Sequence, residues 1–76
     1  MSWIEKDDAL HKTFEFPSFT EAIDWMNKAA VFIDELNHHP EWTNVYNQVR
    51  VRLTTHDAGN TVTEKDRKLA KLLDQL

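Results

Sequence analysis

The sequence predicts an α+β fold of element order ββαββα, in which a four-stranded antiparallel sheet carries both helices on one face. Two segments have apolar residues at helical spacing behind capping signals, and the remaining segments read as short strands joined by turns. The length of 76 residues suits one domain. We therefore expect residues 1–76 to form a single domain.

The first part of the chain is predicted to form two strands. Residues 10–16 form the clearer one, because four side chains share one face at period two, although one of them is a lysine. These residues are Leu10, Lys12, Phe14 and Phe16. Asp7 and Asp8 favour a turn, which places a short strand before them, around residues 3–6.

A long helix is predicted to follow. Ser18 and Glu21 have the spacing of a capping box, with Ser18 as the N-cap. Seven apolar residues then repeat at helical spacing. They are Phe19, Ala22, Ile23, Met26, Ala30, Ile33 and Leu36. The helix should end near Asn37, because asparagine tolerates the left-handed conformation of helix ends and Pro40 disfavours a helical conformation at His39.

The second half is predicted to contain a hairpin and a final helix. Residues 43–46 and 49–55 read as strands, joined by a two-residue loop at residues 47–48. In the second strand, one face is apolar: Val49, Val51 and Leu53. The other face is polar: Arg50, Arg52, Thr54 and His56. Thr63 caps the last helix with Asp66 at its third position, and the helix has one leucine-rich side. These leucines are Leu69, Leu72, Leu73 and Leu76.

Composition excludes several classes of function. The net charge of −4, from nine basic and thirteen acidic residues, argues against binding to a nucleic-acid backbone. The longest apolar run, residues 29–33, is too short to span a bilayer, and the first residues do not resemble a signal peptide. We therefore expect a cytoplasmic protein. A short chain without cysteine also has reason to bury further surface in an oligomer.

Three of the four histidines stand at the ends of predicted elements. His38 and His39 follow the long helix and His56 ends a strand, whereas His11 reads as an isolated surface residue. Imidazole can give and take protons near neutral pH. Two imidazoles on opposite sides of a small substrate could deliver one proton and remove another, as the elimination of water requires.

Two other interpretations of these histidines compete with acid–base catalysis. A His-His-Pro segment is common, and its side chains are most simply solvated. Three imidazoles can also hold a catalytic zinc ion, but adjacent histidines lack the usual spacing on one helical face. Carboxylates that could orient the rings are Asp34, Glu41 and Asp57. Aromatic side chains that could stack on a flat substrate are Trp42 and Tyr46.

The joint spacing of seven residues resembles the signature of the pterin-4a-carbinolamine dehydratases. In chain order these are Asp34, His38, His39, Pro40, Tyr46, His56 and Asp66. The neighbouring residues 14–22, 37–42 and 53–59 strengthen the resemblance, which covers about residues 3–73. The match is specific because several unrelated spacings agree at once.

The resemblance implies the same ββαββα fold and an activity. The activity is a hydro-lyase reaction, the dehydration of 4a-hydroxytetrahydrobiopterin to quinonoid dihydrobiopterin, with no metal and no other cofactor. By position, His38 and His56 would be the acid–base pair on opposite sides of the pterin, and His39 would bind and orient it. The residues lining the substrate would be Asn37, His38, His39, Thr54, Thr55, His56 and Asp57. Supporting residues would be Asp34, Trp42 and Asp66, the last mainly as a helix cap.

The resemblance also implies an alternative function and a quaternary structure. Some relatives act as dimerisation cofactors of a homeodomain transcription factor, so a non-catalytic protein-interaction module is the alternative, although the intact histidines favour catalysis. The family commonly dimerises through its sheet, and we expect a homodimer or homotetramer.

After the last histidine the family usually reads Ala-Gly-Gly-Leu-Thr, whereas residues 58–63 of this chain read Ala-Gly-Asn-Thr-Val-Thr. We expect this change to shift the last helix relative to the site.

Overall fold

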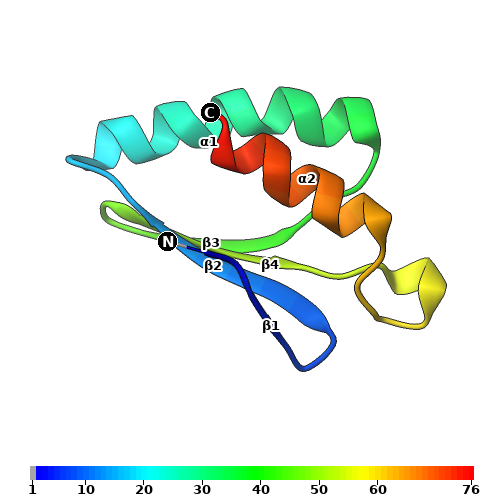
Figure 1. Ribbon diagram of the computed structural model, residues 1–76. Coiled ribbons are helices and arrows are strands. Elements are labelled where there is room, and N and C mark those ends of the chain that lie inside the picture. Colours follow the sequence, from blue (N-terminus) through cyan, green and yellow to red (C-terminus); the bar gives the residue numbers. More distant parts are fainter. Residues whose placement is uncertain (1) are drawn as a thin grey trace.

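The computed structural model describes residues 2–76 and confirms the predicted α+β fold (Figure 1). Its elements are β1 (Ile4–Lys6), β2 (Ala9–Glu15), α1 (Phe19–Leu36), β3 (Glu41–Val45), β4 (Gln48–Leu53), the short 3₁₀ helix η1 (His56–Ala58) and α2 (Glu64–Asp74). The sheet is antiparallel throughout, with strand order β1-β2-β4-β3. Both helices lie on the same face of this sheet, as Figure 1 shows.

The two hairpin turns differ in how well the sequence predicted them. Asp7 and Asp8 form the first turn as expected, and both adopt left-handed backbone angles, with φ of 52° and 61°. The second turn was predicted one residue too late. Val45 pairs with Gln48, so the turn residues are Tyr46 and Asn47, and β4 begins at Gln48.

The physical reason for the shifted turn is a side chain in the preceding strand. The Asn44 amide donates to the carbonyl of Tyr46 at 3.2 Å and to that of Gln48 at 3.0 Å, and so bridges the turn. Asn47 is held from the opposite side, because its amide donates to the carbonyl of Phe16 at 2.9 Å. These bonds fix a turn that leaves Tyr46 with a positive φ of 52°.

Both ends of α1 lie where the sequence predicts them. The Ser18 hydroxyl accepts the N–H of Glu21 at 3.2 Å, and Asn37 ends the helix with a left-handed φ of 50°. The predicted apolar stripe, in contrast, was only partly right. Trp25 and Ala29 lie in the core although the stripe omitted them, and Phe19 is 48% exposed.

The burial of Trp25 explains the difference in α1. Its indole is close to three other rings, with centroids 4.5 Å from Phe14, 5.5 Å from Phe16 and 6.2 Å from Trp42. Burying such a large ring among aromatic neighbours stabilises the fold more than burying the smaller residues of the predicted stripe. The helix is therefore rotated toward its tryptophan.

The rest of the core lies between the sheet and α2. Its largest fully buried apolar side chains are Leu53, Leu69, Leu73 and Val49. Lys12 shares this face of the sheet, and its Nζ lies 2.6 Å from Asp74 Oδ1 at the end of α2 and 4.8 Å from the Phe14 ring centroid. The lysine that interrupted the apolar pattern thus links the sheet to the last helix.

Within residues 2–76, no helix combines the length and the apolar character needed to cross a membrane.

Candidate active site

A fully buried carboxylate, Asp66, joins three segments at one end of the molecule. Its Oδ1 lies 2.6 Å from His38 Nε2, just after α1. Its Oδ2 accepts the Thr55 hydroxyl at 2.7 Å, just after β4, and the backbone N–H of Thr63 at 2.9 Å, at the start of α2. The two threonine hydroxyls are 2.7 Å apart. In Figure 1 these segments meet at the right-hand end of the fold.

Local sequence explains why these groups meet. His38 directly follows the helix cap, and its N–H bonds the carbonyl of Ile33 at 3.3 Å, which fixes the chain as it leaves α1. Thr63 and Asp66 form the capping box that the sequence predicts for α2. The cap places the Asp66 carboxylate at a helix N-terminus, where negative charge is favoured. Asp66 is therefore both a cap and the partner of His38. The sequence predicted it as a supporting residue of the site, mainly as a cap, but did not predict the contact with His38.

The hydrogen bonds to Asp66 determine its protonation. Burial raises the pKa of the Asp66 carboxyl, but the hydrogen bonds from His38, Thr55 and the Thr63 backbone lower it further than burial raises it. The net pKa is below the ordinary value, so the group is ionised at neutral pH. A carboxylate can only accept, so Nε2 of His38 carries the proton that they share. Nδ1 of His38 has no hydrogen-bond partner within residues 2–76.

His56 lies in η1, directly after Thr55, and is exposed. Its Nδ1 is 2.6 Å from the side-chain oxygen of Asn60. Asn60 is not among the site residues predicted from the sequence. The available signal was a polar residue that tolerates a left-handed backbone, placed four positions after a histidine and directly after Gly59.

An open hollow lies beside this network, between η1 and the start of α2. Its volume of about 410 Å³ is in the range of small-molecule sites. The lining residues are Thr55, Asp57, Ala58, Thr63, Glu64 and Lys65. Thr55 and Asp57 are two of the residues that the sequence assigned to substrate binding, and Thr55 is also a partner of Asp66.

His39 lines a different hollow from the one of about 410 Å³ next to η1. Its Nε2 lies 3.2 Å from Asp34 Oδ1, and both side chains are exposed. Together with Pro40 and Trp42 they line a small hollow of about 150 Å³ against α1. The predicted supporting residues Asp34 and Trp42 are thus grouped with His39.

Two other predicted binding residues have backbone partners. The Thr54 hydroxyl donates to the carbonyl of Asp8 at 2.9 Å, and Thr54 is buried, so its side chain holds the first hairpin rather than joining the Asp66 network. Asn37 caps α1, with its N–H bonded to the carbonyl of Asp34 at 3.1 Å.

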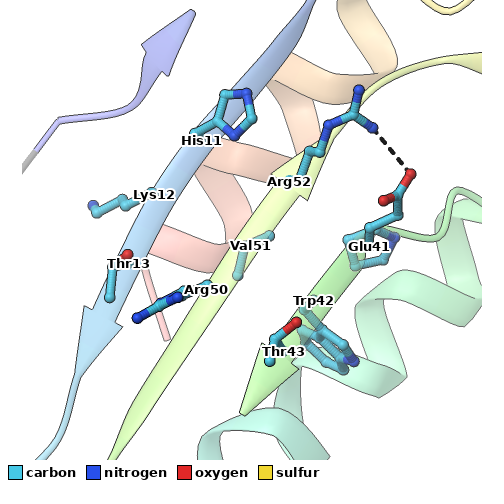
Figure 2. Close-up of a pocket in the computed structure, with 10 residues that line it drawn as sticks. His11, Lys12, Thr13, Glu41, Trp42, Thr43, Arg50, Val51 and Arg52 are labelled. Atoms are coloured by element: carbon cyan, nitrogen blue, oxygen red, sulfur yellow. Dashed lines mark hydrogen bonds and ion pairs between the residues drawn. The ribbon is translucent and has the colours of Figure 1, made fainter. Parts of the chain in front are cut away.

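A larger hollow, of about 650 Å³, lies on the sheet face away from the helices (Figure 2). Figure 2 shows His11, Arg50 and Arg52 on its surface, with Arg52 bonded to Glu41 at 2.9 Å. Of the residues that the sequence singled out for a possible site, Pro40, Glu41 and Trp42 line it. Size does not identify the candidate site. We place the site at the Asp66 network because His38 and the ionised carboxylate supply acid–base groups and Thr55 leads directly into His56.

Across residues 2–76, no group of three or more histidine, cysteine, aspartate or glutamate side chains is arranged to hold a metal ion. The zinc interpretation of the histidines therefore has no geometric support in the described chain.

Comparisons with known proteins agree on one family. The family model described as pterin 4 alpha carbinolamine dehydratase matches residues 1–76. A relative from Opitutus terrae is 53% identical over 74 residues, which cover 97% of this chain and 76% of that protein. A relative from Jannaschia sp. is 47% identical over 73 residues, covering 96% and 74%. The names of both assign them provisionally as pterin-4-alpha-carbinolamine dehydratases.

A solved structure shows the same fold. The crystal structure of a transcriptional coactivator/pterin dehydratase from Brucella melitensis superposes with a TM-score of 0.90 at 41% identity. The alignment covers 96% of this chain and 79% of that one. From the match over all 76 residues and these relatives, the chain belongs to the pterin 4 alpha carbinolamine dehydratase family.

Proposed function

We propose that this protein is a hydro-lyase that dehydrates 4a-hydroxytetrahydrobiopterin to quinonoid dihydrobiopterin. Membership of the dehydratase family supports the substrate class. The observation that carries the proposal is the Asp66 carboxylate, which holds His38 at 2.6 Å and, through Thr55, the segment that leads into His56. His38 and His56, two of the three predicted catalytic histidines, therefore lie at the same end of the fold.

The chemistry needs two proton transfers. A carbinolamine carries a hydroxyl on a carbon that is bonded to an amine nitrogen. Loss of water breaks the C–O bond and the N–H bond and forms a C=N bond. One group must give a proton to the departing hydroxyl, while another removes the proton from the nitrogen. Each such transfer by a positioned side chain typically contributes about 100- to 10,000-fold to the rate.

The residues divide these tasks as follows. His38 and His56 act as the acid–base pair, and the ionised Asp66 positions His38 through its Nε2. Asp57 and Thr55 line the hollow of about 410 Å³ in which we place the pterin. We assign binding and orientation of the substrate to His39, which is paired with Asp34. His39 lines a separate hollow of about 150 Å³ together with Trp42, which offers a flat face.

Single substitutions of the two histidines test this assignment. His38→Ala and His56→Ala should each lower the dehydration rate by about 100-fold or more, because each removes one proton transfer. His11→Ala is the matched control, since His11 lies on the other sheet face and bonds only the carbonyl of Lys6 at 3.1 Å. Circular dichroism checks that each variant is folded. Full activity in a folded His38→Ala/His56→Ala double variant would exclude the proposed mechanism.

A protein-interaction module is the second candidate function. The observation in its favour is that the Brucella melitensis structure is described as a transcriptional coactivator as well as a pterin dehydratase. Interaction does not require the histidines, whereas dehydration does. If the folded protein does not accelerate the spontaneous decay of the carbinolamine, protein interaction becomes the favoured function in place of dehydration.

A further inference from the structure

We propose that Asn60 is a positioning residue that holds His56 with its proton on Nδ1 and presents Nε2 as the proton acceptor of the reaction. The inference rests on the proposed dehydration and deepens it by giving the two histidines different tasks. Asn60 lies in the segment that departs from the family pattern, where Ala58-Gly59 is followed by asparagine in place of a second glycine.

The geometry of one hydrogen bond supports this role. His56 Nδ1 lies 2.6 Å from Asn60 Oδ1. A carboxamide oxygen can only accept, so Nδ1 must carry the proton. In the neutral ring Nε2 then has a free lone pair, and within residues 2–76 it has no hydrogen-bond partner. His56 is exposed, and although it does not itself line the hollow next to η1, the residues on either side of it, Thr55 and Asp57, do. This nitrogen is therefore available to a substrate bound at η1.

The backbone of the loop shows why the asparagine side chain matters. Gly59 and Asn60 are both left-handed, with φ of 82° and 59°, and the N–H of Asn60 bonds the carbonyl of Thr55 at 3.1 Å. Thr55 and Thr61 close the loop as an isolated bridge. Glycine would adopt the same backbone at position 60 at less cost than any other residue. Asparagine adds only its amide, and that amide is bonded to His56.

The two imidazoles are held through opposite nitrogens. His38 is fixed at Nε2 by an ionised carboxylate, and His56 is fixed at Nδ1 by a neutral amide. The two partners leave different nitrogens free, Nδ1 in His38 and Nε2 in His56. His56 Nε2 therefore removes the proton from the substrate nitrogen. His38 keeps its Nε2 proton in the bond to Asp66 and, in its doubly protonated form, gives the Nδ1 proton to the departing hydroxyl.

Three variants and two measurements test the role of Asn60. Asn60→Gly removes the acceptor and keeps the left-handed backbone, and Asn60→Asp keeps an acceptor at the same place. Asp7→Gly is the matched control, because it also replaces a left-handed polar residue, with φ of 52°, in the distant first hairpin. Nitrogen-15 NMR of the substrate-free protein reports which nitrogen of neutral His56 carries its proton. Steady-state kinetics report kcat and KM separately.

We expect His56 of the unaltered protein to be protonated on Nδ1, and Asn60→Gly to lose that preference. In the same variant kcat should fall roughly fivefold to tenfold with little change in KM, the effect of losing one neutral hydrogen bond to a reacting group. Asn60→Asp should keep the preference and most of kcat, and Asp7→Gly should change neither. A His56 protonated mainly on Nε2 in the unaltered protein, or Asn60→Gly with unchanged tautomer and kcat, would overturn the proposal. Absence of dehydratase activity would instead refute the proposed function, because the tautomer measurement does not depend on turnover.

Discussion

The carboxylate of Asp66 accepts three hydrogen bonds. The donors are His38, two residues after α1, Thr55, two residues after β4, and the backbone N–H of Thr63, the N-cap of α2. The carboxylate is fully buried, so each donor offsets part of the cost of removing a charge from water. The same three bonds orient His38 and fix the backbone next to His56. The stability of this end of the fold and the geometry of the candidate site therefore depend on one group.

We predict that acid weakens the fold through Asp66. Its pKa in the folded protein is below the ordinary value, so folding favours the ionised form. This contribution is fully present above the unfolded-state pKa of about 3.9 and is lost as the pH falls through the folded-state pKa. Urea unfolding of the unaltered protein and of Asp66→Asn at pH 7 and below pH 4 measures the difference.

The Asp66→Asn variant should be less stable at pH 7 by about 1–3 kcal/mol, because one buried hydrogen-bond partner is lost. Its stability should also decrease less than that of the unaltered protein as the solution is acidified. An identical decrease in both proteins would show that Asp66 does not carry the effect.

At the residue scale, the sequence predicted which side chains stand at element ends but not which contacts they make. The capping pattern assigned Asp66 its bond to Thr63, since that contact is local. The bond from Asp66 to His38 joins residues 28 positions apart and depends on how α2 packs beside the end of α1. Asn60 was missed because its contact depends on two consecutive left-handed residues.

At the element scale, the β3–β4 turn shows how a side chain can override residue-type rules. A turn at residues 47–48 would have placed only polar residues at its centre. The Asn44 amide instead bridges the carbonyls on either side of Asn47, which moves Tyr46 into the turn. Tyr46 is then 67% exposed, with a left-handed φ of 52°. A bulky residue in this region carries a conformational cost.

We predict that Tyr46→Asn stabilises the protein by about 0.5–1 kcal/mol, because asparagine adopts the left-handed region at lower cost than tyrosine. Thermal or urea unfolding measures the change. Tyr46→Phe is the control and should have no effect, since it alters the ring hydroxyl and not the backbone preference. Equal stability of Tyr46→Asn and Tyr46→Phe would show that the turn is not strained.

The caps of the helices were more predictable than their buried faces. Ser18, Asn37 and Thr63 mark helix ends through local bonds that their side chains or backbones make. The buried face of α1 depends on where Trp25 finds aromatic partners, and those partners come from two separate segments, β3 and the end of β2. Periodicity alone does not contain that information.

At the scale of the whole molecule, the helices cover one face of the sheet and leave the other face and both edge strands open (Figure 1). Several large apolar side chains remain on the surface. They include Ile4, Phe19, Val31 and Val45, each between 48% and 63% exposed. A domain of this length buries a smaller share of its surface by itself than a larger domain does. The architecture was predictable because helix and strand periods agreed with a single layered arrangement.

We predict that the chain forms a homodimer or homotetramer, which would bury some of this surface. Light scattering coupled to size-exclusion chromatography at micromolar concentration should give two or four times the 9.0 kDa chain mass. The unfolding midpoint should also rise with protein concentration, because association stabilises the folded chain. A monomeric mass at that concentration would contradict this prediction.

The most direct test of the central claim is stopped-flow ultraviolet absorbance of freshly generated 4a-hydroxytetrahydropterin near neutral pH, with and without the protein. We expect the unaltered protein to accelerate the decay and the folded His38→Ala/His56→Ala variant to leave it at the spontaneous rate. No acceleration by the folded unaltered protein, or equal acceleration by the double variant, would contradict that claim.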